Sequence, residues 1–419
     1  MKQIRLHLIA LCLLLSVPFT VWGETSDEPL SNEQTIPEKG LKLLRNLTLS
    51  GYIQGQYQYG QEAASLKVGS KNEKSDEAFN RVGIRLGRLK VIYNEGIASG
   101  VFQIDMTEKG INLKDAYLNI YDPWLKTNAL RVGLMEQPFG YEISYSSATR
   151  ESAERATVIQ TLFPAMCDLG AMVILRPATT SPLHFLQLQA ALVAGNGNKR
   201  ETDSKRDFIA HLIADKQFGG NFSLAGGLSY YRGSVYQGTQ SVYRMEGNSF
   251  VLTNDPNQIG EYAKREYMGA DLRVGFRSLL GNTKITGEYL FGQQPGIKGN
   301  SKSPNSASLP TEDTYIRPFR GGYVMCAQSL GSLPLSVVVK YDWYDPNTKV
   351  SGDEIGVNHT GAADLTVSTW GTGLFWDMKK YLRLLAYYEF VSNEKSEKLT
   401  GYAGNVKDNV FTLRLQYKF

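Results

Sequence analysis

The sequence predicts an all-β protein: a transmembrane antiparallel β-barrel of about 16 strands. Three observations lead to this fold. From Leu47 onward the chain divides into segments of roughly ten residues in which apolar and polar residues alternate. The connections between these segments are alternately long and short, as in barrels with long extracellular loops and short periplasmic turns. Within the segments the arginines share a face with other polar residues.

The amino terminus has the pattern of an export signal. Lys2 and Arg5 precede an apolar run from Leu8 to Val21, and Gly23 supplies a small residue for cleavage. A membrane-spanning helix needs about 20 apolar residues, so this run is too short for one. We therefore expect a signal peptide over residues 1–23 and, because residues 24–46 are polar, a flexible periplasmic leader. The barrel is expected over residues 47–419.

The last segment shows the two faces of a strand most clearly. Its apolar face carries Phe411, Leu413, Leu415, Tyr417 and Phe419, and its polar face carries Thr412, Arg414, Gln416 and Lys418. An arginine on the lipid face near the bilayer midplane costs about 2 to 4 kcal/mol. The charged face must therefore line a wet interior. By the same alternation Val82, Ile84 and Leu86 are expected to face lipid, opposite Arg81 and Arg85.

The predicted strands can be placed along the whole chain. They begin near Leu47, Asn80, Ile97, Ile111, Thr127, Asp168, Leu183, Arg206, Asn221, Lys264, Asn282, Ile316, Pro334, Thr366, Tyr381 and Val406. One connection departs from the alternation, because Glu108 to Gly110 lies on the outer side and is short. The terminal Phe419 resembles the carboxy-terminal aromatic signal of bacterial outer-membrane barrels.

Composition argues against several other functions. The formal charge of +4 becomes +2 once Lys2 and Arg5 are removed, which does not suit a nucleic-acid surface. The mature chain keeps His184, His211 and His359 on three separate segments, without a G-x-S-x-G or H-E-x-x-H motif. We therefore predict no enzyme, cofactor or metal site, although a converging Ser, His and Asp set would reopen the question. Cys167 and Cys326 are expected to be either two buried thiols or one disulfide.

Several stretches resemble the phosphate-selective porin O and P family. These are GINLKDAYLNIY (110–121), RVGLMEQPFGYE (131–142), SSATRESAERATVIQTLFP (146–164) and DLG (168–170). The resemblance is strongest over residues 81–197. It implies a sixteen-stranded, trimeric porin of the bacterial outer membrane, in which the loop after the fifth strand folds inward to narrow the pore.

In this sequence the inward loop corresponds to residues 137–167. Arg150 and Arg155 alternate there with Glu151 and Glu154, so a constriction at this loop would carry both signs of charge. The alternative is a solvated loop closed by internal salt bridges.

The sequence departs from the pattern of this family at two places, and both differences remove positive charge. Leu134 to Gln137 stand where the family usually has a lysine before its Pro-Phe-Gly motif, and Cys167 stands where an arginine commonly precedes Asp-Leu-Gly. Eleven cationic positions are nevertheless expected to face inward against eight acidic ones: Arg81, Arg85, Arg131, Arg176, Arg273, Arg277, Lys284, Lys340, Arg383, Arg414 and Lys418 against Asp105, Asp115, Asp168, Asp215, Asp271, Glu288, Asp342 and Glu389. We therefore predict a weak anion preference.

The expected function is passive diffusion of small hydrophilic solutes, with a possible preference for phosphate among anions. The expected pore-lining residues are Arg81, Arg85, Asp105, Asp115, Arg131, Arg273 and Arg277. The expected partners are outer-membrane lipid, small anions or polar solutes, and two further copies of the chain. The alternative is a non-conducting barrel, plugged by its own loops, with a structural or surface-interaction role.

Overall fold

The computed structural model describes residues 44–419, and residues Asn46–Phe419 form one compact unit. The predicted signal peptide and most of the predicted leader lie outside the described residues. Between residues 44 and 419, no helix combines the length and the apolar composition needed to cross a membrane. The short helix α3 (Thr157–Leu162) is accompanied by the 3₁₀ turns η1 (Pro256–Gln258), η2 (Gly352–Glu354) and η3 (Ala362–Asp364).

Strands make up most of this unit. They are β1 (Leu47–Gly60), β2 (Phe79–Glu95), β3 (Ala98–Thr107), β4 (Gly110–Tyr121), β5 (Ala129–Glu136), β6 (Cys167–Leu175), β7 (Leu186–Val193), β8 (Asp207–Phe218), β9 (Phe222–Tyr236), β10 (Ser241–Glu246), β11 (Ser249–Asn254), β12 (Tyr262–Ser278), β13 (Gly281–Gly296), β14 (Thr314–Ser329), β15 (Leu335–Asp345), β16 (Val367–Lys379), β17 (Leu382–Asn393) and β18 (Val410–Lys418).

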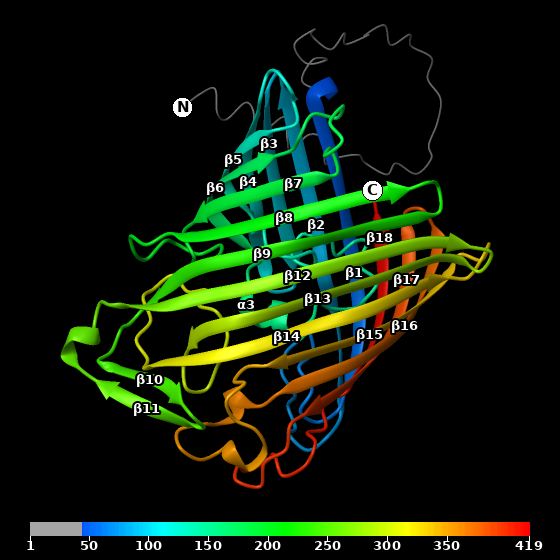
Figure 1. The fold of residues 1–419 in the computed structure, drawn as a ribbon. Coiled ribbons are helices and arrows are strands. Elements are labelled where there is room, and N and C mark those ends of the chain that lie inside the picture. The colour runs from blue at the N-terminus through cyan, green and yellow to red at the C-terminus, as the bar shows by residue number, and fades with distance from the viewer. Residues whose placement is uncertain (1–43) are drawn as a thin grey trace, which may run out of the picture. The chain divides into compact units, whose positions relative to one another are not determined.

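Sixteen of these strands form a closed antiparallel barrel (Figure 1). Each pairs with its neighbours in chain order, and β18 pairs with β1 from Tyr52↔Lys418 to Gly60↔Val410, which closes the ring. The hairpin of β10 and β11 lies outside this order, because β9 pairs directly with β12. β10 adds a short parallel pairing to β14. The predicted barrel is confirmed, and the hairpin is an extra element within an outer loop.

Alternation of side chains explains why these segments form a barrel. On β18 the outward Leu413 and Leu415 are exposed at the barrel surface, while the inward Thr412, Arg414 and Gln416 are buried. An apolar outer surface suits lipid, and ring closure leaves no unpaired strand edge in the bilayer.

Two β-bulges change the alternation on one side of the barrel. β1 pairs Gln54 with Leu86 and Gly55 with Ile84, which leaves Arg85 as an extra residue in β2. An extra residue shifts the facing of every side chain beyond it. The prediction that Leu86 faces lipid is therefore wrong: Leu86 is buried in a cluster with Tyr52 and Ala148.

The second bulge lies in β4. β3 pairs Gln103 with Asp115 and Ile104 with Leu113, so that Lys114 is the extra residue. Lys114 and Asp115 are consecutive, and both are buried. A strict alternation would have placed one of them outside.

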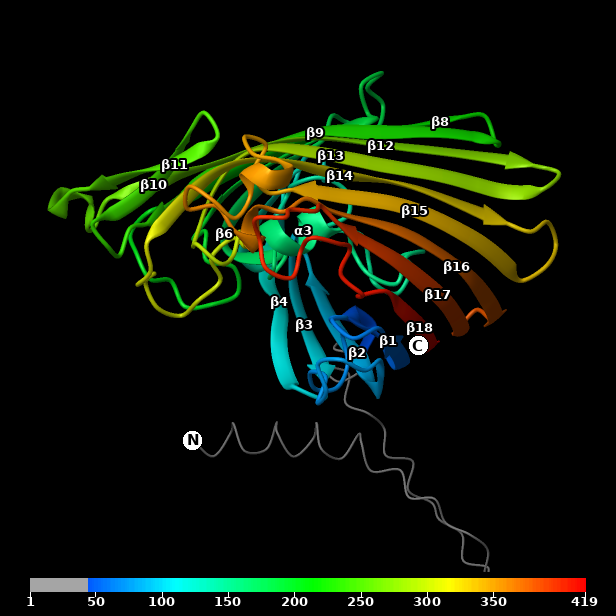
Figure 2. The same cartoon turned by 90° about the horizontal axis from the view of Figure 1, so that it is seen from below.

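The connections follow the expected asymmetry. Long loops join the strands at one end, including residues 61–78, 194–206, 237–261 and 346–366, whereas 219–221 and 279–280 are short turns at the other. β3 and β4 are joined by the tight turn that the sequence indicated, with Thr107 paired to Gly110. In Figure 2 helix α3 lies within the ring of strands, so the segment between β5 and β6 enters the barrel.

Candidate functional site: the barrel interior

Residues 137–166, here called the inner loop, cross the inside of the barrel. Glu154 of this loop is ion-paired with Arg85 on β2 and with Arg414 on β18. Two further ion pairs join the loop to strands elsewhere in the ring, Glu142 with Lys340 on β15 at 2.9 Å and Glu151 with Lys284 on β13 at 3.0 Å. Because these strands belong to different parts of the ring, the loop is attached at several points around the lumen.

The apolar side chains of the inner loop pack against one part of the wall. α3 buries Val158, Ile159 and Leu162. The ring of Phe163 lies 5.0 Å from that of Phe139 and 5.8 Å from that of Tyr267 on β12, measured between centroids. These residues belong to a buried cluster that also takes in side chains of β13 to β17. Burial of large aromatic rings supplies most of the energy that holds such a segment in place.

The backbone amides at the amino terminus of helix α3 donate hydrogen bonds to carboxylates from other parts of the chain. The Ala156 amide donates to the Glu142 carboxylate at 2.8 Å, and the Thr157 amide donates to Asp342 on β15 at 3.0 Å. The cap residue itself makes no side-chain hydrogen bond. Carboxylates at a helix amino terminus satisfy free amides and interact favourably with the helix dipole, so the polar contacts and the apolar packing fix the same short helix.

The four charged residues predicted for the constriction all lie in the inner loop, but they have different roles. Arg150 donates to the carbonyls of Ser152 and Ala153. Arg155 donates to three further carbonyls of the loop, those of residues 142, 143 and 145. The two arginines therefore stabilise the loop backbone, whereas Glu151 and Glu154 reach the barrel wall.

Burial raises the pKa of Glu154, but the guanidinium groups of Arg85 and Arg414 more than offset this effect and hold its pKa well below the usual range. The carboxylate is therefore charged at neutral pH. Its ion pairs keep the loop attached on the β1 side of the barrel.

The predicted pore-lining residues fall into two groups, and the side chains of the first group are engaged with other side chains, three of the four in ion pairs. Arg81 contacts Glu73 of an extracellular loop, Arg85 contacts Glu154, and Asp105 accepts two hydrogen bonds from Arg88, at 2.6 and 2.7 Å. Asp115 lies against the thiol of Cys167 at 3.5 Å, beside Lys114.

The second group keeps positive charge available to the lumen. Arg131 donates to the Asn119 amide oxygen at 2.8 Å and lies over the ring of Tyr117. Arg273 lies over Tyr141, with its nearest carboxylate contacts at 3.6 and 3.8 Å. Arg277 is exposed and donates to Asn282.

The bulges bring in cations that the sequence reading missed. Arg88 and Lys114 are both buried inside the barrel, with Lys114 3.3 Å from Glu136 and 2.6 Å from the sulfur of Cys167. Lys90 follows Arg88 on the same face and lines the same cavity. Arg265 and Arg317 were also missed, and both are buried against carboxylates. A comparison of the lengths of neighbouring predicted strands could have suggested that bulges are present, but it could not have given their positions.

Three cavities occupy the barrel interior on the side of the short turns, and together they are called the vestibule. Their volumes are about 370, 280 and 450 Å³. Eight cationic residues line them: Arg88, Lys90, Arg131, Arg176, Arg273, Arg277, Lys284 and Lys418. Three carboxylates line them: Asp115, Asp215 and Glu136. Three of the eight cations are paired with carboxylates just outside the lining, Arg88 with Asp105, Arg273 with Asp271 and Lys284 with Glu151, so the balance is eight cations against six carboxylates and the surplus is small.

Several of these cations have no countercharge within the described part of the chain. Lys90, Arg131, Arg176, Arg277 and Lys418 form no ion pair between residues 44 and 419. Positive charge therefore remains inside the barrel without a fixed carboxylate partner among the described residues.

Both cysteines of residues 44–419 are free thiols. Cys167 is buried and Cys326 is exposed. Cys326 lies on the outer face of β14, between Met325 and Ala327, which are both buried. Of the two alternatives left open by the sequence, the structure shows the unpaired one, but the expectation that both thiols are buried is wrong for Cys326, because it lies on the lipid-facing side of its strand.

The fold and the interior together define the class of this protein. A closed sixteen-stranded antiparallel barrel with an apolar outer surface and a charged, hollow interior is a transmembrane barrel of the bacterial outer membrane.

Comparison with solved structures gives the same fold. The Salmonella typhi OmpF complex with daunomycin matches with a TM-score of 0.56 and 11% identity, covering 89% of this chain and 97% of that one. The outer membrane channel DcaP of Acinetobacter baumannii matches with a TM-score of 0.52 and 14% identity, over 89% and 97%. An anion-selective porin from Comamonas acidovorans matches with a TM-score of 0.52 and 13% identity, over 89% and 99%. No protein-family profile and no curated protein sequence matches this chain.

Proposed function

We propose that this chain is an outer-membrane porin through which small hydrophilic solutes diffuse passively, with a weak preference for anions. The observation that carries the proposal is the vestibule, where five of the eight lining cations form no ion pair among the described residues. Fixed charge of one sign along a narrow, low-dielectric passage raises the local concentration of the opposite ion. No covalent step or cofactor is needed for this function.

Phosphate is one of several anions that this surplus would favour. The resemblance of residues 110–170 to the phosphate-selective porin O and P family supports its inclusion, while the missing lysine and arginine of that family's motifs argue against a dedicated phosphate filter. We therefore propose selectivity by charge rather than by a phosphate-shaped site. Similar permeability for chloride and phosphate would support this, and a strong phosphate preference would contradict it.

The test of the porin function is a reversal potential measured across a planar bilayer in a salt gradient. The refolded protein should give a potential of the sign expected for anion preference. Lys90→Glu combined with Lys418→Glu should move this potential toward cations, because both residues line the vestibule without an ion pair. Lys109→Glu is the matched control, since Lys109 lies in the exposed turn between β3 and β4. Cation preference of the wild-type protein would refute the proposal.

A non-conducting barrel is the second candidate. The observation that favours it is the apolar cluster of the inner loop, which fills part of the lumen and packs against much of the wall. Single-channel conductance separates the two functions. Resolved current steps support the porin, and a bilayer that stays silent despite verified insertion supports the plugged barrel.

We also propose that three copies assemble. The outer face of β2 to β4 carries strongly exposed apolar residues, with Val82 74%, Ile111 69% and Phe102 62% exposed. Ile111 is close to the tight turn at Thr107, where the barrel has no long loop. Unheated gel electrophoresis should show an oligomer band, which Phe102→Lys should weaken while Phe276→Lys on the outer face of β12 should not. A band that both variants leave equally strong would assign the contact to another face.

A further inference from the structure

One cavity of the vestibule, of about 280 Å³, is lined by strands β1 to β5, by β18 and by Ser144 and Ser146 of the inner loop. It is here called the β1–β5 cavity. Two carboxylates line it, Asp115 and Glu136, whereas Asp215 is the carboxylate that lines the other two vestibule cavities. Its volume lies just below the range of pockets for drug-sized ligands, about 300 to 1,000 Å³. The cavity therefore suits a small, charged solute.

Three cations of this cavity are available to a ligand. Lys90 on β2 and Lys418 on β18 flank β1, where they pair in register with Ser50 and Tyr52. Lys90 and Arg131 on β5 are half-buried, and Lys418 is exposed, so their charged groups can be reached from the lumen. None of the three forms an ion pair within residues 44–419. They are free to bind carboxylate groups.

The two carboxylates of the cavity share one lysine. Lys114 lies 3.3 Å from Glu136 and 2.6 Å from the sulfur of Cys167, and that thiol lies 3.5 Å from Asp115. Asp115 itself forms no ion pair among the described residues. The side chain of Glu136 is 30% exposed. One negative charge of this wall therefore remains without a contacting cation.

A ligand that matches the β1–β5 cavity carries both signs of charge. An ammonium group can approach Asp115 and Glu136, while carboxylate groups can approach the three free cations. Complementary charge of this kind gives specificity, because a ligand with only one sign of charge leaves the opposite groups of the cavity unmatched. The cavity has more free cations than unbalanced carboxylates. The matching ligand therefore has more carboxylates than ammonium groups.

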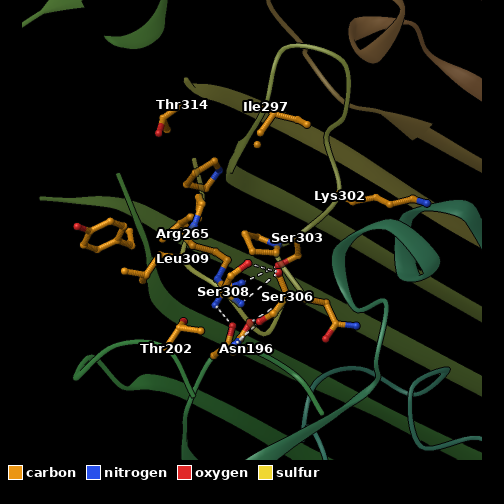
Figure 3. Close-up of a pocket in the computed structure, with 18 of the residues that line it drawn as sticks. Asn196, Thr202, Arg265, Ile297, Lys302, Ser303, Ser306, Ser308, Leu309 and Thr314 are labelled. Atoms are coloured by element: carbon orange, nitrogen blue, oxygen red, sulfur yellow. Dashed lines mark hydrogen bonds between the residues drawn. The ribbon is translucent and has the colours of Figure 1, made fainter. Parts of the chain in front are cut away.

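A fourth cavity, of about 510 Å³, lies at the end of the barrel that carries the long loops (Figure 3). Its Arg265 is ion-paired with Asp207, and Lys302 shares the lining with Asp203 and Glu312. With Asp207 included, two cations stand against three carboxylates. An acidic ligand would meet net negative charge there, whereas the β1–β5 cavity offers it free cations.

We propose that the β1–β5 cavity binds acidic amino acids, which carry two carboxylates and one ammonium group. Lys90, Lys418 and Arg131 bind the carboxylates, and Asp115 and Glu136 bind the ammonium group. This inference rests on the proposed porin function, because it names a class of solute that the vestibule would admit.

The test is calorimetric titration of the refolded protein, in a non-ionic detergent at neutral pH, with glutamate, glutarate and glutamine in turn. Glutarate keeps both carboxylates and lacks the ammonium group, and glutamine keeps the ammonium group with one carboxylate. Glutamate should bind most tightly. Each of the other two should bind roughly three- to tenfold more weakly, the effect of one charged contact at a partly exposed site.

Variants should assign the two ends of the ligand. Asp115→Asn and Glu136→Gln should weaken the binding of glutamate and leave glutarate no weaker, whereas Lys90→Gln should weaken both ligands. Asp215→Asn is the matched control, because Asp215 lines only the other two vestibule cavities. The comparison of the three ligands on the wild-type protein needs no substitution, so it remains decisive if a variant fails to fold.

Reversal potentials recorded on the same preparations separate this inference from the porin proposal. Tight glutamate binding by a protein that passes no current would contradict the porin function and support the binding site. Anion-selective current without saturable glutamate binding would overturn the inference alone. Glutarate that binds at least as tightly as glutamate would also overturn it and would reassign the cavity to dicarboxylates, as would glutamate binding that neither Asp115→Asn nor Glu136→Gln weakens.

Discussion

Arg85 and Glu154 form a two-point ion pair inside the barrel, with Nε–Oε1 at 2.8 Å and Nη2–Oε2 at 2.7 Å. Arg414 adds a third contact, from its Nη2 to Oε1 of the same carboxylate at 2.9 Å. Because Arg85 lies on β2 and Arg414 on β18, one carboxylate of the inner loop joins the two strands that flank β1. This relationship attaches the inner loop to the wall on the β1 side of the lumen.

Glu154→Gln should loosen the inner loop without unfolding the barrel. The substitution leaves two guanidinium groups inside the barrel without their counterion, and removing one partner of a buried ion pair costs about 3 kcal/mol or more. The expected result is larger and noisier single-channel conductance, recorded in planar bilayers.

The matched control for Glu154→Gln is Glu151→Gln. Glu151 contacts only one cation, Lys284, and its side chain is three times as exposed, at 18% against 6% for Glu154. The control should change the conductance less. Equal conductance in the wild type and Glu154→Gln would show that this ion pair does not position the loop.

The proposed anion preference should weaken as salt concentration rises. The unpaired cations of the vestibule, such as Lys90 and Lys418, act on passing ions through water. The Debye length shortens from about 10 Å at 0.1 M to about 3 Å at 1 M salt. Reversal potentials measured at a fixed concentration ratio should therefore approach zero at high salt. A preference that persists at 1 M would indicate direct binding of the anion rather than a field.

The loop before β18 should respond to mild acid through Asp408. Burial raises the pKa of this carboxyl group from 3.8 to about 6. Between these two values the folded loop holds a proton that the unfolded loop releases, so loop stability falls as pH rises through this window. Hydrogen exchange over residues 394–409, corrected for intrinsic rates, should show stronger protection at pH 5 than at pH 7.5. Asp408→Asn should remove most of this difference, and an unchanged difference in that variant would exclude Asp408 as its source.

The alternation of side chains was enough to predict the ring of strands. Lipid accepts no charged face, so one buried arginine such as Arg414 determines the facing of its whole strand. For the same reason the expected loop lengths agree with the structure, including the tight turn at Thr107. The β10–β11 hairpin was not predicted because it lies within a loop, where no lipid boundary constrains its pattern.

The lining of the lumen was harder to predict, because it depends on a few local departures from alternation. One bulge residue, Arg85, displaces Leu86 to the inside and brings Arg88 with it. The other bulge residue, Lys114, places a cation next to Cys167. Cys167 occupies the position at which the phosphate-selective porin family commonly has an arginine. Bulges are set by cross-strand register, which a single sequence does not show. The roles of Arg150 and Arg155 likewise depend on carbonyl positions that only the folded loop defines.

Phe163→Ala should release the inner loop from the opposite side of the lumen. Phe163 is only 2% exposed, and its ring contacts Phe139, Tyr231 and Tyr267. Truncating a buried phenylalanine costs about 3 to 5 kcal/mol. We expect this loss to destabilise the packing of the inner loop rather than the barrel, because the strands keep their own hydrogen bonds. Trypsin should then cut at Arg150 or Arg155, which are protected in the wild type by bonds to loop carbonyls. Phe390→Ala, on the outer face of β17 and 50% exposed, should remain uncut. If Phe163→Ala resists trypsin while retaining the gel mobility of a folded barrel, the ion pairs alone hold the loop, and the aromatic cluster contributes little to its position.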